Sequence, residues 1–196
     1  MKVVLATRNQ GKVREFGEAL AALGWTIEGL PENVPAVIED GLTFEDNARK
    51  KAEEVAEFLQ TPVLADDSGL EVDALDGRPS VFSARYAGEN ASDSANNSKL
   101  LEELAGVPID NRSARFVCVL ALARPKEPTL LARGECEGVI LEQPRGAGGF
   151  GYDPLFFVPD LQKTFGELTL DEKNRISHRA KAIRSLMQLV PAGDNG

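Results

Sequence analysis

The stretch PVLADDSGLEVDAL, residues 62–75, holds two adjacent carboxylates between two apolar segments. Consecutive side chains of a strand point to opposite faces of a sheet, so Asp66 and Asp67 cannot share one environment. We expect an apolar strand that ends at these acids, a turn at Ser68 and Gly69, and a second short apolar stretch. One acid would anchor the local structure, and the other would face whatever lies beyond the strand end. The alternative is an Asx-type turn in which water solvates both acids.

Strand and helix patterns alternate on both sides of this stretch. Strands are predicted for KVVLAT at 2–7, SARFVCVLALA at 113–123 and TLLARGECEGVI at 129–140, the last two as an antiparallel pair. Helices are predicted after RNQG at 8–11, from Thr43 with Asp46 as a capping box, at 98–106, from Thr169 with Glu172, and at 177–190, before a frayed tail at 191–196. We therefore expect an α/β fold, with a mixed sheet, helices on its faces and no clean domain boundary within residues 1–196.

The composition indicates a cytoplasmic protein that folds without disulfides. The chain has 196 residues, 42% of them hydrophobic, which is enough to bury a substantial core. No run approaches the roughly 18 consecutive apolar residues of a membrane-spanning helix, and MKVVLAT is too short for a signal peptide. Cys118 and Cys136 show no metal or redox spacing, so we expect one buried thiol and one incidental thiol.

Charge and histidine content argue against two classes of protein. A formal net charge of -9 argues against coating a nucleic-acid polymer, because such surfaces need clustered Lys and Arg. The same charge permits a small phosphorylated ligand. The single histidine, His178, excludes a zinc site built from several histidines, and any Ser-His-Asp mechanism would have to use it.

The segment TRNQGK, residues 7–12, lies where the first strand leads into a helix. Free backbone N–H groups and the positive end of the helix dipole attract anions at such a junction. Thr7 and Asn9 can donate side-chain hydrogen bonds there, and Lys12 adds a full charge. The Walker pattern GxxxxGK[ST] is absent. The alternative is a polar connection with Lys12 in solvent.

The segment RGAGGFGYDPLF, residues 145–156, contains a literal GxGxxG. We reject a dinucleotide-binding loop, because no strand precedes it and Pro154 prevents the required helix. Glycines at this density permit close approach of the backbone to a flat or charged ligand, with Phe150 and Tyr152 available for stacking. The alternative is a structural glycine loop whose aromatic side chains lie in the core.

The segment KNRISHR, residues 173–179, gathers four cationic or titratable side chains near a helix start: Lys173, Arg175, His178 and Arg179. Positive charge is unfavourable at that end of a helix dipole, so we infer a compensating anion, with a solvated helix end as the alternative. Lys50 and Lys51 lie off the apolar stripe of their helix, which predicts a solvent face.

Together these segments provide the parts of a nucleoside triphosphate site. They supply an anion-binding loop, further cations and a glycine-aromatic loop for a base. Mg²⁺ prefers a few carboxylate oxygens together with waters and phosphates, which Asp67, helped by Glu39 or Asp66, could offer.

Six ordered blocks, spread over nearly the whole chain, resemble one known family. They are ATRNQGKVREF at 6–16, GLTFEDNARKKA at 41–52, LADDSGLEVDAL at 64–75, SARYAG at 83–88, GGFGYDPLF at 148–156 and ELTLDEKNRISHRAKA at 167–182. The chain resembles the inosine triphosphate pyrophosphatases, which hydrolyse the non-canonical purine nucleotides dITP, ITP and XTP. The resemblance implies an elongated mixed β-sheet flanked by helices, two closely joined lobes around a central cleft, and a homodimer.

The resemblance also implies roles for individual residues. Phosphates would bind Thr7, Asn9, Lys12 and Lys51, with Ser68 beside the phosphates or the metal. Glu39 and Asp67 would hold Mg²⁺, and Asp67 would also accept the proton of the attacking water. The base would be recognised by Phe150, Gly151, Tyr152, Asp153, Lys173, His178 and Arg179. Hydrolysis of the α–β phosphoanhydride would release the monophosphate and pyrophosphate and cleanse the nucleotide pool. The sequence assigns no role to Arg8.

Three other functions remain open. A nucleotide-binding or sensing module would keep the ligand and drop the reaction, although Asp67 and Lys12 disfavour it because a sensor needs no base. A phosphatase that forms an aspartyl-phosphate would release orthophosphate, but the adjacent DD lacks the usual DxD arrangement. A related pyrophosphatase for modified pyrimidine nucleotides would differ only in its base pocket.

Overall fold

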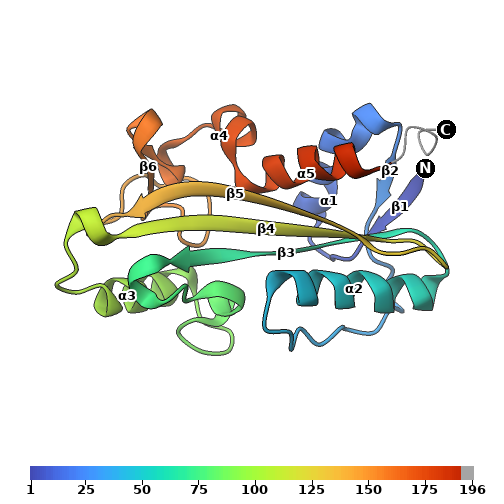
Figure 1. The fold of residues 1–196 in the computed structure, drawn as a ribbon, viewed down its shortest axis with the longest axis horizontal. Helices are drawn as coiled ribbons and strands as arrows, with labels where there is room; N and C mark the ends of the chain where they lie inside the picture. The colour runs from blue at the N-terminus through green and yellow to red at the C-terminus, as the bar shows by residue number, and fades with distance from the viewer. Residues whose placement is uncertain (191–196) are drawn as a thin grey trace. The chain divides into compact units, whose positions relative to one another are not determined.

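The computed structural model describes residues 1–190, apart from the side chains at positions 11 and 22, and shows an α/β fold (Figure 1). The strands are β1 (Lys2–Leu5), β2 (Thr26–Glu28), β3 (Val63–Val72), β4 (Ser113–Ala123), β5 (Leu130–Ile140), β6 (Phe156–Val158) and β7 (Lys163–Thr164). The α-helices are α1 (Gln10–Leu20), α2 (Phe44–Leu59), α3 (Asp93–Glu103), α4 (Leu170–Ile176) and α5 (His178–Leu189). Short 3₁₀ helices span Ala21–Leu23, Asp73–Leu75, Ser80–Arg85, Ile109–Asn111, Pro159–Leu161 and Phe165–Glu167. The frayed tail predicted at 191–196 lies outside the described residues.

Seven strands form one sheet in the order β2-β1-β3-β4-β5-β6-β7. β1 runs parallel to β2, with Lys2 opposite Thr26, and parallel to β3, with Val4 opposite Val63. β6 runs antiparallel to both β5 and β7. The sheet is therefore mixed, which confirms the predicted fold class. The strands β2, β6 and β7 have only two or three residues each, and the sequence patterns did not predict them.

The course of β3 shows that the predicted turn at Ser68 and Gly69 is wrong. β3 runs unbroken from residue 63 to residue 72, so the two adjacent acids lie in the middle of the strand. The strand continues because its two halves are both buried, with Leu64 in one hydrophobic cluster and Leu70 in another. This burial outweighs the local turn preference of Asp, Ser and Gly.

The chain forms two compact units, each with its own core. Unit 1 comprises residues 1–67, 118–134 and those from Arg179 onward, and unit 2 comprises residues 68–117 and 135–178. The strands β3, β4 and β5 contribute residues to both units. The single domain of residues 1–196 with two closely joined lobes stays a prediction.

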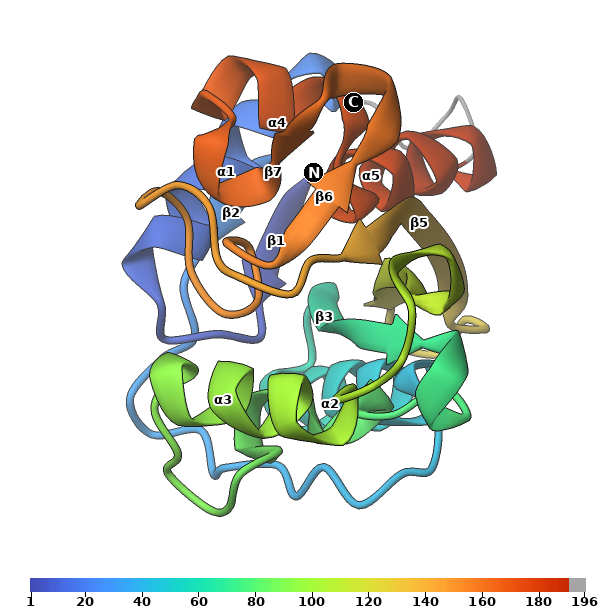
Figure 2. The same cartoon turned by 90° about the vertical axis from the view of Figure 1, so that its left-hand side faces the viewer.

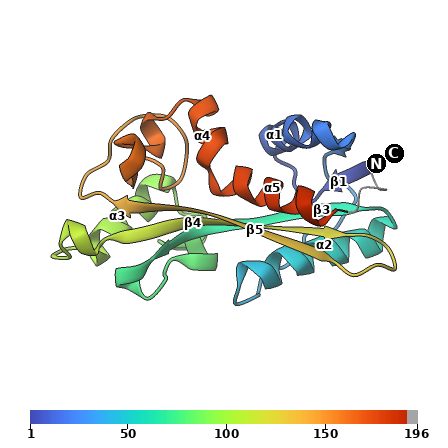
Figure 3. The same cartoon turned by 45° about the horizontal axis from the view of Figure 1, so that its top comes forward.

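In unit 1, α2 covers one face of the strands, and α1 with α5 covers the other (Figures 1 and 3). The face of α1 and α5 buries Val3, Leu5, Phe16, Leu20, Leu64, Cys118, Leu120, Leu122, Ala182, Ile183 and Leu186 in one cluster. The predicted start of α2 is confirmed, because Thr43 caps the helix by accepting a hydrogen bond from the Asp46 N–H. Because side chains alternate along β3, Asp66 lies on the face of α1 and Asp67 on the face of α2.

In unit 2, α3 lies on one side, and α4 with β6 and β7 lies on the other (Figure 2). The core includes Leu70, Leu100, Leu104, Phe116, Phe156 and Phe165. The Phe116 and Phe156 ring centroids lie 4.3 Å apart, and the His178 ring stacks on Phe116 at 5.0 Å. Aromatic contacts of this kind fix His178 at the start of α5.

The structure also bears on three smaller predictions from the sequence. Cys118 and Cys136 are both buried thiols, so the expectation that only one of them is buried is wrong. Lys173 and Arg175 lie in the last turn of α4, where the helix dipole favours positive charge, so they do not sit at a helix start. No helix within residues 1–190 is long and apolar enough to cross a membrane.

Candidate active site

The loop between β1 and α1 is shaped by side chains that bind its own backbone. Thr7 Oγ1 accepts a hydrogen bond from the Asn9 N–H at 3.2 Å, and Asn9 Oδ1 accepts one from the Lys12 N–H at 3.3 Å. These bonds order the first turn of α1 through the side-chain oxygens alone, without using the hydroxyl and amide donors. Arg8 donates a hydrogen bond to the Val34 carbonyl at 2.8 Å. Arg8 therefore has a structural role, because it links this loop to the segment between β2 and α2.

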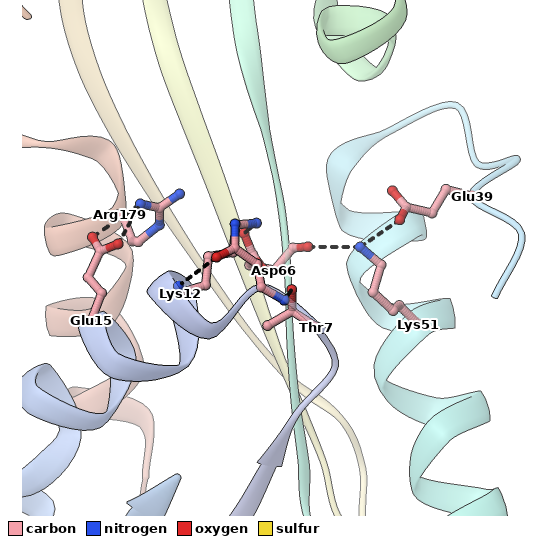
Figure 4. Close-up of polar contacts among 8 residues, drawn as sticks. Thr7, Lys12, Glu15, Glu39, Lys51, Asp66 and Arg179 are labelled. Atoms are coloured by element: carbon pink, nitrogen blue, oxygen red, sulfur yellow. Dashed lines mark hydrogen bonds and ion pairs between the residues drawn. The ribbon is translucent and has the colours of Figure 1, made fainter. Parts of the chain in front are cut away.

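Asp66 is the acid that anchors the local structure (Figure 4). Its buried carboxylate accepts a hydrogen bond from Lys12 Nζ at 2.8 Å, and its backbone carbonyl accepts one from Lys51 Nζ at 3.1 Å. Burial alone would raise the pKa of Asp66. The charges of Lys12, Arg179 and Lys51 outweigh burial and hold that pKa below its usual value. Asp66 therefore stays ionised and ties α1 to β3.

Asp67 faces the opposite side of β3 and is held by Asn47 of α2. Asn47 is buried, and its Oδ1 accepts a hydrogen bond from the Gly41 N–H at 2.8 Å. This bond leaves the Asn47 NH₂ group to donate to the Asp67 carboxylate, with which its side chain is hydrogen-bonded. The sequence did not single out Asn47, although a polar residue within an apolar helical stripe is a signal that could have revealed it.

The pKa of Asp67 is raised to about 6. Burial is the main cause, and the nearby carboxylates of Glu39 and Asp66 add to it. The hydrogen bond from Asn47 and the charge of Lys51 act in the opposite direction without cancelling the rise. A carboxylate that binds a proton near neutral pH suits a general base, because proton transfer is most efficient when the pKa lies near the working pH.

Glu39 and Asp67 form a pair of carboxylates that would suit a divalent cation. Their mutual repulsion contributes to the raised pKa of Asp67, and a cation between such groups relieves repulsion. Lys51 Nζ lies 2.7 Å from Glu39 Oε1, so the predicted solvent face for Lys51 is wrong. Within residues 1–190, no three His, Cys, Asp or Glu side chains cluster as a metal site. Two carboxylates fit Mg²⁺, which takes its remaining ligands from water and phosphate.

Arg179, the second residue of α5, is paired with Glu15 of α1. Its Nη1 donates to both Glu15 oxygens, at 3.0 and 3.1 Å, and the guanidinium lies 5.8 Å from the centroid of the Phe16 ring. The anion that compensates this helix start is therefore Glu15, which the sequence did not identify. Its position three residues after Lys12, on the same face of α1, is a signal that could have revealed it.

In unit 2, the glycine loop between β5 and β6 is closed by Asp153. The Asp153 carboxylate is buried and accepts hydrogen bonds from the Phe150 N–H at 3.1 Å and from Lys173 Nζ at 2.6 Å. A Cβ on Gly149 would lie 2.1 Å from Asp153 Oδ2, so only glycine fits there. Gly146 approaches the chain itself, because a Cβ there would lie 2.4 Å from the backbone of Gly166.

The two aromatic side chains of this loop point in different directions. Phe150 is 63% exposed, and Lys173 Nζ lies 5.0 Å from its ring centroid. Tyr152 is buried, and its hydroxyl donates to the Ser83 carbonyl at 2.7 Å. The interpretation that both rings are available for stacking is therefore wrong for Tyr152, and Phe150 alone is exposed.

The predicted site residues fall into two groups. Unit 1 contains Thr7, Asn9, Lys12, Glu39, Lys51, Asp67 and Arg179, and unit 2 contains Ser68, Phe150, Gly151, Tyr152, Asp153, Lys173 and His178. Ser68 follows Asp67 on β3 and points to the opposite face of the strand. The role of each residue toward a ligand stays a prediction.

The Ham1 family model matches residues 3–189 of this chain. The chain belongs to the Ham1 family. Among the relatives of this chain, the dITP/XTP pyrophosphatase of Desulforamulus reducens is 55% identical over 192 residues, which cover 97% of this chain and 96% of the relative. The dITP/XTP pyrophosphatase of Geobacillus kaustophilus is 54% identical over 187 residues, which cover 94% of this chain and 92% of the relative.

Solved Ham1 structures share the fold. The Staphylococcus aureus Ham1 protein superposes with a TM-score of 0.90 at 44% identity, covering 96% of this chain and 97% of that chain. A Ham1 protein from Coxiella burnetii gives a TM-score of 0.91 at 44% identity, covering 96% and 98%. The family resemblance and the fold class predicted from the sequence are both confirmed.

In the metal-free protein, we expect the Asp67 carboxyl to titrate near pH 6. The folded pKa exceeds the ordinary value of 3.8, so the stability contributed by proton binding is complete below pH 3.8 and is lost as the pH rises through about 6. Carboxyl ¹³C NMR measures this directly, with Asp66 as an internal reference that titrates below its usual range. Asp67→Asn removes the titration, so its Tm relative to wild type should rise between about pH 4 and pH 6 and level off above that range. A Tm difference that does not change with pH contradicts this expectation.

Proposed function

We propose that this chain is a Mg²⁺-dependent pyrophosphatase that converts dITP, ITP and XTP to the monophosphate and pyrophosphate. The observation that carries the proposal is the Asp67 carboxyl, whose pKa is raised to about 6 beside Glu39 and Lys51, in a chain 55% identical to a dITP/XTP pyrophosphatase. A cytoplasmic location, which the composition indicates, and a homodimeric state, which the family resemblance implies, belong to the same proposal.

The residues of unit 1 would act on the phosphates. Water that attacks the α-phosphorus must lose a proton, which Asp67 accepts while Asn47 holds its carboxylate in place. Lys12 and Lys51 offset the charge that develops on the departing pyrophosphate. Thr7 and Asn9 hold the phosphates at the start of α1. Glu39 and Asp67 would hold Mg²⁺, which supplies positive charge to the phosphates when bound.

The residues around the glycine loop and α5 would recognise the base. Phe150 offers its exposed ring for stacking, and Lys173, His178 and Arg179 offer hydrogen-bond donors. A 6-oxo purine accepts such bonds, whereas the 6-amino group of adenine would leave the donors unpaired. Unpaired polar groups in a site can produce selectivity of several orders of magnitude.

The site argues against two of the three alternative functions and leaves the third to a comparison of substrates. An aspartyl-phosphate phosphatase needs two acids on one side of the strand, whereas Asp66 and Asp67 lie on opposite faces of β3, and Asp66 is occupied by Lys12. A sensor without turnover has no use for a carboxyl whose pKa is raised to about 6. A pyrophosphatase for modified pyrimidines would share the residues of unit 1, so only substrates separate it from the proposal.

A substrate panel tests the proposal. With Mg²⁺ present, we expect pyrophosphate and monophosphate from dITP, ITP and XTP, with kcat/KM at least about 10²-fold above that for ATP. Modified pyrimidine triphosphates serve as the comparison set. Release of orthophosphate, or equal rates on ATP and ITP, would overturn the proposed reaction or the proposed selectivity respectively. Binding of ITP without turnover would favour the sensor.

A further inference from the structure

The helix α3 binds both backbone polar groups of Gly151. Asp93 Oδ2 accepts a hydrogen bond from the Gly151 N–H at 2.8 Å, and Asn97 Nδ2 donates one to the Gly151 carbonyl at 3.0 Å. Asp93 and Asn97 are four residues apart, so they lie on the same face of α3, one helical turn from each other. All three residues belong to unit 2. One residue of the glycine loop is thus held by a single helix.

The helix itself is firmly attached to unit 2. Ser92 caps its first turn by accepting a hydrogen bond from the Ala95 N–H. Asn96 accepts a hydrogen bond from the Ala87 N–H at 2.8 Å and donates one to the Ala84 carbonyl at 3.1 Å. Leu100 is fully buried in the core of unit 2. Asp93 and Asn97 therefore project from a rigid element.

The two peptide groups that flank the Phe150 Cα are both hydrogen-bonded. The Phe150 N–H donates to Asp153, and the N–H of the next peptide group, which belongs to Gly151, donates to Asp93. Gly151 has a φ of +59°, in the left-handed region that glycine adopts most readily, and its carbonyl is held by Asn97. The backbone on both sides of Phe150 is therefore fixed although its ring is exposed.

We propose that Asp93 and Asn97 are positioning residues that hold the Phe150 ring in the orientation in which it stacks on the nucleotide base. This inference rests on the proposed function, which assigns Phe150 to the base. An exposed ring on a mobile loop would have to be ordered when the nucleotide binds, and that ordering weakens affinity. A ring that is already oriented avoids this cost. The contribution concerns binding of the base, and the reacting phosphates are recognised by other residues.

The test compares ligands with and without a base. In Asn97→Ala and Asp93→Ala, we expect KM for ITP and the inhibition constant of IMP to rise about five- to tenfold. kcat and the inhibition constant of pyrophosphate, which has no base, should stay within about twofold of wild type. Asp93→Asn keeps an acceptor oxygen and should restore most of the affinity for IMP. Ser98→Ala, at an exposed position of the same helix, is the matched control and should match wild type.

A second measurement needs no nucleotide. Because Asp93 accepts from the Gly151 N–H, Asp93→Ala should speed hydrogen exchange of the Gly151 amide by about tenfold or more, measured by NMR, while Ser98→Ala should not. An unchanged Gly151 exchange rate overturns the proposed hold on the loop. Unchanged IMP inhibition, or equal weakening of IMP and pyrophosphate, overturns the proposed role toward the base. If wild type does not hydrolyse ITP, the proposed function fails instead, and the exchange rates still decide whether α3 holds the loop.

Discussion

Asp67→Asn is expected to lower kcat for ITP by about 10³-fold or more while the protein folds as wild type does. The amide keeps the shape of the carboxyl and can still accept the hydrogen bond from Asn47, but it cannot take the proton of the attacking water. Folding should not suffer, because burial disfavours the charged form of Asp67 in the native protein.

Steady-state kinetics and thermal unfolding on the same samples measure both halves of this prediction. Asp46→Asn is the matched control, because Asp46 is an exposed acid on α2, the helix that carries Asn47. It should keep the wild-type kcat. A kcat for Asp67→Asn within about tenfold of wild type, at saturating Mg²⁺, would remove Asp67 from its proposed role.

Lys12→Met is expected to damage both stability and activity. The Asp66 carboxylate is buried and loses its closest cation, a change that costs about 3–5 kcal/mol when both partners are fully buried. The Lys12 side chain is 31% exposed, so we expect a loss nearer to about 2 kcal/mol at neutral pH. The stability from the lowered pKa of Asp66 disappears as the pH falls, so this loss should shrink below pH 3.8. kcat/KM should fall by about 10² or more, because Lys12 also offsets phosphate charge.

The double variant Lys12→Met/Asp66→Asn separates these two effects. Replacing Asp66 by Asn removes the uncompensated carboxylate, so most of the lost stability should return, while activity should not. Urea unfolding at neutral pH gives the free energies, and a pyrophosphate assay gives the activity. If the double variant is no more stable than Lys12→Met, the ion pair is not the source of the loss. If Lys12→Met keeps wild-type kcat/KM, Lys12 does not act on the phosphates.

Parts of the fold could be predicted because local patterns and burial agree. β4 spans Ser113–Ala123, as its continuous apolar run predicts, because a strand buried on both faces needs apolar residues at every position. The opposite placement of Asp66 and Asp67 follows from alternation along a strand, and the structure confirms it with Lys12 beside one acid and Asn47 beside the other.

Other parts could not be predicted because contacts distant in the sequence decide them. The residues DDSG have the local chemistry of a turn, yet they continue β3, since Leu64 and Leu70 are buried in separate clusters. Glu15 and Arg179 are 164 residues apart, so no local pattern pairs them. Tyr152 and Phe150 look equivalent in the sequence, and only the folded structure, in which Tyr152 donates to the Ser83 carbonyl, shows which ring is buried.

The proposed reaction requires the Asp67 carboxylate to deprotonate a water that attacks the α-phosphorus of a deaminated purine nucleotide. Hydrolysis of ITP in H₂¹⁸O with Mg²⁺, followed by mass spectrometry of both products, tests it most directly. We expect one ¹⁸O atom in the phosphate of IMP and none in pyrophosphate, and Asp67→Asn should form almost no labelled IMP. Label in pyrophosphate, or release of labelled orthophosphate, would contradict attack at the α-phosphorus.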